Sequence, residues 1–141
     1  MTQLIASLSR MPWPLKILTL LSLVSVLLVA ATIVPGGAVV GQKKVGLEEW
    51  WTNGSGPVFT AAVCIFFGAG VLLLKARPIG RLAYILGIAG LYFAGYLVER
   101  INGVSYSRDD YVYDFLFAAF QIAALSTYFF LSRRVKSYLA T

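Results

Sequence analysis

Long apolar stretches alternate with short polar segments along the whole chain. Four of these stretches contain no Lys, Arg, Asp, Glu or His, and they cover about residues 17–34, 58–74, 82–98 and 115–131. About 20 helical residues, rising about 1.5 Å each, cross the roughly 30 Å hydrocarbon core of a bilayer. The pattern therefore predicts an all-α membrane protein with a single domain, residues 1–141, folded as an antiparallel four-transmembrane-helix bundle. We expect its spans at about residues 15–35, 57–75, 80–98 and 112–132.

Charged residues form two groups that alternate along the chain. The N-terminal segment, the link between the second and third spans, and the tail hold eight cations and no acid: Arg10, Lys16, Lys75, Arg77, Arg81, Arg133, Arg134 and Lys136. The other two loops hold four cations and all six acids. Because cytoplasmic loops of membrane proteins are rich in Lys and Arg, we expect both termini in the cytoplasm (N-in/C-in). Compact size and short loops favour a bacterial inner membrane.

The composition argues against several classes of site. The formal charge of +6 is spread over span ends and forms no single basic stripe, so we expect no nucleic-acid partner. The chain has no histidine and one cysteine, Cys64, which leaves no residue set for a metal, a cofactor or a His-based catalytic pair. We therefore expect no catalytic residues, no metal and no cofactor, and we interpret the protein as non-enzymatic.

Small residues inside the spans follow a 3–4 spacing, which is typical of narrow packing seams between membrane helices. The third span has the predicted helix-packing seam with most glycine: Gly80, Ala83, Gly87, Gly90 and Ala94. The other spans have three shorter seams: Ser22, Ser25, Val29 and Thr32; Ala61, Cys64 and Gly68; Ala119, Ala123 and Ser126. We interpret these seams as contacts within the bundle, and contacts between copies in a homo-oligomer remain the alternative.

Gln121 is the one side-chain amide expected at mid-membrane depth. An amide in hydrocarbon is costly unless it forms a hydrogen bond across helices. We interpret it as an intramembrane polar contact between helices, and a contact to a ligand or partner is the alternative.

The two loops opposite the basic segments are the predicted recognition surface. The first loop predicts a small hairpin over residues 38–45, or a short interfacial helix at Leu47–Trp51. The second loop contains Tyr106 and ends with Ser107-x-x-Asp110, a capping-box pattern that predicts the start of the fourth helix. Aromatic residues and Arg beside charges favour binding, and the expected partner-binding residues are Glu48, Glu49, Trp50, Trp51, Arg108, Asp109, Asp110 and Tyr111. An aromatic belt with a helix cap is the alternative interpretation.

The sequence favours an interaction protein over a transporter or an enzyme. Proton relays and ion-coupled carriers need ionisable groups or broken helices at membrane depth, and we expect neither here, although an oligomeric small-molecule exporter remains the alternative. In span count alone the chain resembles small immunity proteins that neutralise pore-forming or membrane-targeted bacterial toxins. Such a protein, or an accessory subunit of a membrane complex, would bind another membrane-active protein within the lipid bilayer. The expected lipid-facing aromatics are Phe66, Phe67, Phe93, Phe117 and Phe120.

Overall fold

A computed structural model describes residues 8–34, 36–105 and 107–140. Tyr106, expected in the second loop, lies outside these ranges. The elements in chain order are α2 (Trp13–Val24), α3 (Val26–Ile33), β1 (Gly37–Val40), β2 (Lys43–Gly46), α4 (Leu47–Thr52), α5 (Ser55–Leu74), α6 (Gly80–Ile101), α7 (Arg108–Leu131) and α8 (Arg133–Leu139). Four helical segments are long and apolar enough to cross a membrane, which confirms this part of the prediction; α2 and α3 together form the first.

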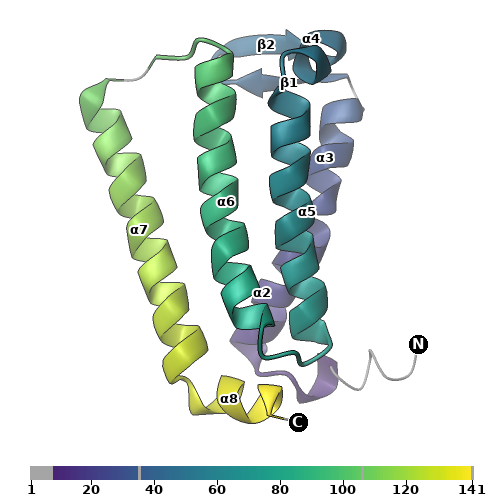
Figure 1. Ribbon diagram of the computed structural model, residues 1–141, viewed down its shortest axis with the longest axis vertical. Helices are drawn as coiled ribbons and strands as arrows, with labels where there is room; N and C mark the ends of the chain where they lie inside the picture. Colours follow the sequence, from purple (N-terminus) through teal and green to yellow (C-terminus); the bar gives the residue numbers. More distant parts are fainter. Residues whose placement is uncertain (1–7, 35, 106, 141) are drawn as a thin grey trace.

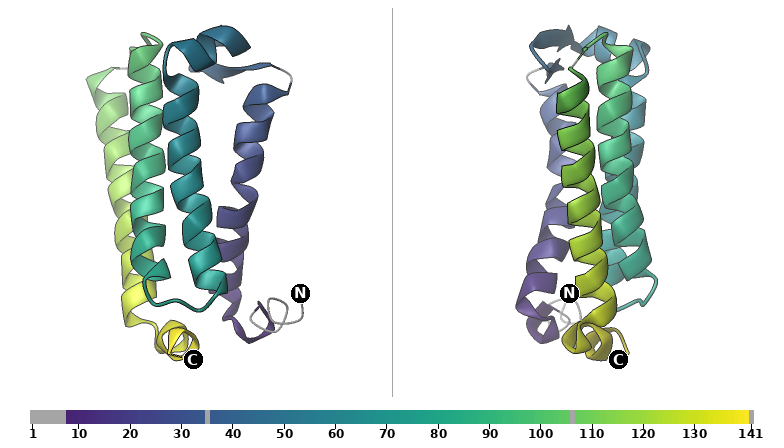
Figure 2. Two further views of the ribbon diagram at one scale, coloured as in Figure 1. Left: turned by 45° about the vertical axis from the view of Figure 1, so that its right-hand side comes forward. Right: turned by 90° about the vertical axis from the view of Figure 1, so that its left-hand side faces the viewer.

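The spans run in alternate directions, and each packs mainly on the next along the chain (Figures 1 and 2). α2 and α3 pack on α5, α5 packs most extensively on α6, and α6 packs on α7. One end of the bundle carries β1, β2, α4 and the start of α7, and we call it the hairpin end. The opposite end carries the start of α2, the α5–α6 link and α8, and we call it the α8 end.

The loop after the first span contains both elements that the sequence offered as alternatives. β1 and β2 form an antiparallel hairpin in which Val40 pairs with Lys43 and Gly37 with Gly46. Its turn is permitted by Gly41, whose φ of 60° lies in the left-handed region that glycine adopts without strain. The short helix α4 follows directly after the hairpin and covers the start of α5.

The first span is divided at Ser25, whereas the sequence predicted no broken helix. The Ser25 hydroxyl donates to the carbonyl of Ser22 (2.6 Å), and the amide of Leu28 donates to the carbonyl of Ser25 (2.9 Å). These i–3 bonds tighten the turn between α2 and α3 and bend the span, as Figure 2 shows. Ser25 itself keeps a helical backbone, with φ of −56° and ψ of −26°. The span is therefore kinked and not unwound.

The α5–α6 contact uses one part of the predicted seam of α6. Gly80, Gly87 and Ala94 are buried, and each is seven residues from the next, which places each within about 20° of the next around the helix. A Cβ at Gly87 would lie 3.0 Å from Cα of Phe66, so this glycine permits close approach to α5. Gly90 takes no part in this contact, because an added Cβ there would meet nothing within 4 Å.

The predicted seam of α5 was wrong. Ala61 and Cys64 are exposed, and a Cβ at Gly68 would meet no atom within 4 Å. α5 lies between two neighbours and packs on them through other residues: Ala62, Val63, Phe66, Ala69, Gly70 and Leu73 are buried. Its Phe66, expected to face lipid, is only 5% exposed. The seam of the fourth span was also wrong at Ala119 and Ala123, which are exposed.

The first span packs as predicted through its small polar residues. Ser22, Ser25 and Thr32 are all buried. The Ser22 hydroxyl donates to the carbonyl of Phe66 on α5, and an added Cβ at Gly70 would collide with the Ser22 side chain. A serine hydroxyl thus joins α2 to α5 at a point where both backbones approach closely.

The main core lies toward the α8 end, where residues of α2, α5, α6, α7 and α8 meet. Its buried members are Met11, Leu15, Phe66, Ala69, Leu73, Tyr84, Phe129, Val135, Tyr138 and Leu139. The Tyr84 ring lies between those of Phe66 and Phe129, with centroid distances of 4.9 and 5.2 Å. Its hydroxyl donates to the carbonyl of Leu18 (3.0 Å), so one α6 side chain connects three other spans.

α7 is the least packed span. Only 6% of its most apolar 18-residue stretch is buried, against 39% for α5. Its core contacts lie near its end, where Phe129 is fully buried. Toward the hairpin end α7 diverges from the other spans (Figure 1). The molecule is therefore a compact three-span body with a fourth span attached mainly near the α8 end.

Candidate functional site

A polar network closes the hairpin end of the three-span body. Asn102, at the end of α6, is 8% exposed and donates to the Ser55 hydroxyl (2.9 Å) and to the carbonyl of Val98 (2.7 Å). Its carbonyl oxygen accepts a hydrogen bond from the amide of Asn53 (3.1 Å), whose own oxygen accepts from the backbone N–H of Ser55 (2.9 Å). The network joins the turn after α4, the start of α5 and the end of α6.

Sequence reasoning missed this network. The available signal was weak: Asn102 precedes Gly103, as expected for a helix end, and Asn53 precedes Gly54 in a turn. Both residues have a turn role that accounts for them without any partner. Only the folded chain shows that the two turns lie next to each other.

α4 presents three of its four predicted partner-binding residues to the surface. Glu48, Glu49 and Trp51 are exposed, and Glu49 forms a 2.8 Å ion pair with Lys43 of β2. Both members of this pair are about half exposed, so it adds little to stability. The surface of α4 is therefore acidic, with one indole at its edge.

Trp50 was wrongly placed in the partner-binding set. It is 3% exposed and packs with Val40, Val45 and Val98 beneath the hairpin, with its ring 6.0 Å from that of Phe59. Adjacent residues of a helix point about 100° apart, and in α4 it is Trp50 that points inward, where its large apolar ring finds contacts. Trp50 is thus a core residue beneath the hairpin and has almost no surface available to a partner.

The start of α7 forms the predicted capping box. The Ser107 hydroxyl accepts the backbone N–H of Asp110 (3.2 Å), and the Asp110 carboxylate accepts the backbone N–H of Ser107 (3.1 Å). Asp110, expected to bind a partner, therefore serves the helix. Arg108 and Asp109 stay exposed. Among the residues that the structure describes, the one ion pair is Lys43–Glu49. Arg108 and Asp109 therefore form no ion pair with any of them.

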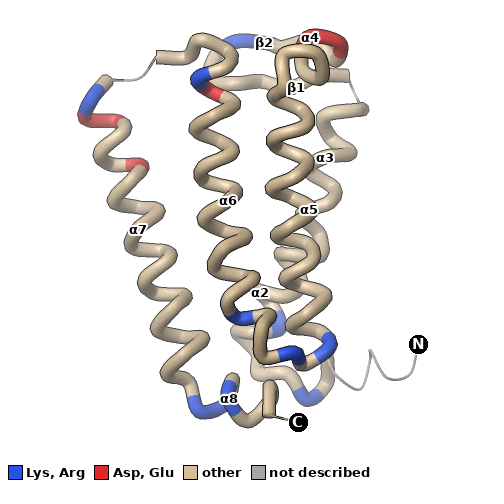
Figure 3. Tube along the Cα trace, in the orientation of Figure 1, with Lys and Arg blue, Asp and Glu red and all other residues tan. Residues whose placement is uncertain are grey.

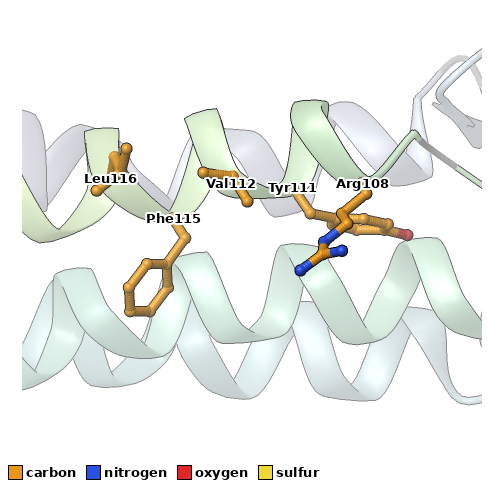
Figure 4. Close-up of a pocket in the computed structure, with 5 residues that line it drawn as sticks. All are labelled: Arg108, Tyr111, Val112, Phe115 and Leu116. Carbon is orange, nitrogen blue, oxygen red and sulfur yellow. The ribbon is translucent and has the colours of Figure 1, made fainter.

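A groove runs along α7 from this capped end. Its volume is about 510 Å³, and it is lined by Arg108, Tyr111, Val112, Phe115 and Leu116. Arg108 and Phe115 extend toward the neighbouring helix (Figure 4). The Tyr111 ring lies 6.0 Å from that of Tyr96 on α6, edge to face, and the Arg100 guanidinium lies 5.9 Å from the Tyr96 ring. The groove thus has a cationic, aromatic start and an apolar continuation.

The structure does not bring the two predicted groups of partner-binding residues into one surface. Both lie at the hairpin end, but α4 covers α5, whereas the start of α7 lies on the far side of α6 (Figures 1 and 3). A partner that binds α7 therefore need not contact α4.

Gln121 lies between helices. Its side-chain oxygen accepts a hydrogen bond from the Tyr92 hydroxyl of α6 (2.7 Å), and Gln121 is partly buried. The bond crosses the α6–α7 contact within the spans, where an unpaired amide would be costly. This hydrogen bond joins α7 to α6 between the main core and the hairpin end.

Within the described ranges, no three Cys, Asp or Glu side chains come close enough to hold a metal ion. Known families, curated proteins and solved structures contain no match to this chain. The site is therefore argued from its own geometry.

Proposed function

We propose that this protein is a non-enzymatic interaction protein of the bacterial inner membrane that binds a membrane-active partner along α7. The proposal rests on one observation, the sparse packing of α7 against the other helices. Every residue from Val112 to Phe117 is exposed, all around the helix, and so is Phe120. Lipid is as apolar as a protein core, so a membrane helix gains stability mainly from close packing with other helices. A span with so little packing of its own has most of its surface available to another helix.

The charged residues in the first two turns of α7 support a protein partner in preference to lipid alone. Asp114 is exposed at the seventh position of α7, and Arg108 and Asp109 lie one to two turns before it. A carboxylate near membrane depth is costly and usually paired, and aromatic residues beside Arg favour binding. We propose that a partner's apolar hairpin or helix lies against Phe115, with a cation near Asp114.

An immunity protein is the most concrete form of this function. α7 would occupy the surface that a pore-forming or membrane-targeted toxin uses to assemble, and the acids at the hairpin end would attract a basic toxin. A small accessory subunit of a membrane complex would use the same surface. Both forms assume cytoplasmic termini, which the charge distribution supports: the α8 end collects the eight cations without acids (Figure 3).

Site-specific crosslinking tests the proposal. A photoreactive residue is placed at Phe117 or Phe120 on α7, with Ile65 on the exposed face of α5 as the matched control. Each variant is co-expressed with the products of neighbouring genes. We expect an adduct from α7 and none from Ile65, and growth arrest when the neighbouring product is expressed alone. Equal adducts from both helices, or no toxic and no co-purifying neighbour, would refute the proposal.

A further inference from the structure

The C-terminal helix α8 folds back under the bundle. Ser132 adopts an extended backbone, with φ of −65° and ψ of 117°, which ends α7 and turns the chain. Val135, Tyr138 and Leu139 are then buried in the core at the α8 end. The Tyr138 hydroxyl donates to the carbonyls of Leu73 (3.2 Å) and Leu74 (3.4 Å), the last residues of α5. Burial raises the pKa of the Tyr138 hydroxyl above its ordinary value.

This docking places cations from three elements around one rim. α8 exposes Arg133, Arg134 and Lys136, and the α5–α6 link beside it exposes Lys75 and Arg77. Arg81, in the first turn of α6, holds its guanidinium 5.5 Å from the ring of Phe130 on α7. We call these six residues the basic rim.

The basic rim has no acidic counterpart. No Asp or Glu occurs in residues 1–47, 50–98 or 115–141. In the described part of the chain, the single ion pair lies at the other end of the molecule. Six positive charges therefore lie around one end of the bundle, and none forms an ion pair within the described part of the chain.

We propose that the basic rim binds the phosphodiester headgroups of anionic phospholipids. Phosphate is the anion that Lys and Arg bind at a membrane surface. The rim borders side chains that face the acyl region: Phe130 and Leu131 are exposed directly before α8. A lipid satisfies both surfaces at once, whereas a soluble acidic protein would leave these side chains uncovered. This inference is independent of the partner proposed for α7.

The orientation of the chain in the membrane would explain why cations occur near these span ends. It would not explain why the fold gathers them on one rim. The orienting effect of Lys and Arg requires charge near the span ends and no particular fold. Here Val135, Tyr138 and Leu139 bury one face of α8 in the core, and the Tyr138 hydrogen bond joins it to the end of α5, so its polar face lies beside the α5–α6 link. Such an amphipathic helix in the headgroup layer is suited to hold lipid.

Lipid titration of the purified full chain tests the inference. Binding of phosphatidylglycerol and of phosphatidylcholine is measured by native mass spectrometry in detergent, for the original chain and for Arg133→Gln/Arg134→Gln. Lys43→Gln/Lys44→Gln is the matched control, because it removes the same charge from two exposed sites on β2 at the hairpin end, away from the α7 groove. Each cation near an anionic surface contributes about fivefold in affinity, so the rim variant should lose roughly 25-fold for phosphatidylglycerol.

We expect the control to bind phosphatidylglycerol as the original chain does, and phosphatidylcholine to bind equally weakly to all three. Equal affinity for both lipids, or an equal loss in the control, would overturn the inference. Glycerol 3-phosphate at millimolar concentration distinguishes a soluble ligand, and full competition by it would also overturn the lipid assignment. Lys75→Gln/Arg77→Gln should repeat the loss, which separates a rim effect from a local change in α8.

Discussion

The close approach of α5 and α6 can be tested with two glycines of one helix. A Cβ added at Gly87 would lie 3.0 Å from Cα and Cδ2 of Phe66 and 3.3 Å from its Cβ, whereas one added at Gly90 would meet nothing within 4 Å. The Phe66 ring can turn, but its Cα belongs to the α5 backbone and can move only with the helix. Gly87→Ala therefore overpacks the contact and Gly90→Ala does not.

The expected magnitudes follow from two opposing effects. Replacing glycine by alanine inside a helix gains up to about 1 kcal/mol of propensity at either position. Overpacking a tight contact costs about 1–3 kcal/mol, and only Gly87→Ala incurs it. Gly90→Ala should leave the free energy of unfolding unchanged or raise it by up to about 1 kcal/mol. Gly87→Ala should lie about 1–3 kcal/mol below Gly90→Ala.

Equilibrium unfolding in mixed detergent micelles, followed by circular dichroism, measures this difference. The comparison between the two alanine variants cancels the propensity gain and isolates the packing cost. Gly80→Ala provides a repeat, because its added Cβ would lie 2.9 Å from the backbone nitrogen of Leu73. If Gly87→Ala and Gly90→Ala agree within about 0.5 kcal/mol, a spread typical of independent surface changes, then α6 does not approach α5 through Gly87.

Three further changes test the two ends of the bundle. Asn102→Ala leaves the Ser55 hydroxyl without its donor in a buried site and should cost about 1–3 kcal/mol of unfolding free energy; an unchanged denaturation midpoint would contradict the network. Ser107→Ala removes the capping box shared with Asp110 and should cost about 0.5–2 kcal/mol, seen as faster amide exchange in the first turn of α7. Ala76→Gly relieves a φ of 53° after α5 and should stabilise by about 0.5–1 kcal/mol; a loss of stability in the same assay would show that its methyl contact matters more than backbone strain.

Elements with local chemistry were predictable from the sequence. Ser107-x-x-Asp110 predicted the capping box, and the pattern of the first loop predicted the hairpin over residues 38–45. The four spans followed from apolar length alone. In each case the signal lies within a few consecutive residues, so no knowledge of tertiary neighbours is needed.

Packing faces were much less predictable. In water the buried face of a helix is its apolar face, but in lipid both faces are apolar and the periodic signal is lost. Small residues were the remaining guide. They identified Gly80 and Gly87 on α6, yet on α5 they pointed to Cys64, which is exposed, and missed Gly70 and Phe66, which are buried.

The candidate site was predictable only in part. Exposed charges on α4 and at the start of α7 followed from composition, but Trp50 proved to be buried. The groove along α7 could not be foreseen, because no sequence pattern showed that the first half of this helix would have so few packing neighbours. Asn102 and Tyr138 act through contacts to residues 47 and 65 positions away, beyond the range of any sequence pattern.

The separation of charge between the two ends has an electrical consequence. Eight uncompensated cations lie at the α8 end, while four cations and six acids at the hairpin end leave two net negative charges. In a cell whose interior is negative, the voltage pulls the α8 end inward and pushes the opposite end out. Each elementary charge contributes about 2.3 kcal/mol per 100 mV, so reversing the molecule in the membrane would cost roughly 20 kcal/mol at that voltage. A membrane that maintains this voltage would therefore keep the protein in one orientation after its insertion is complete.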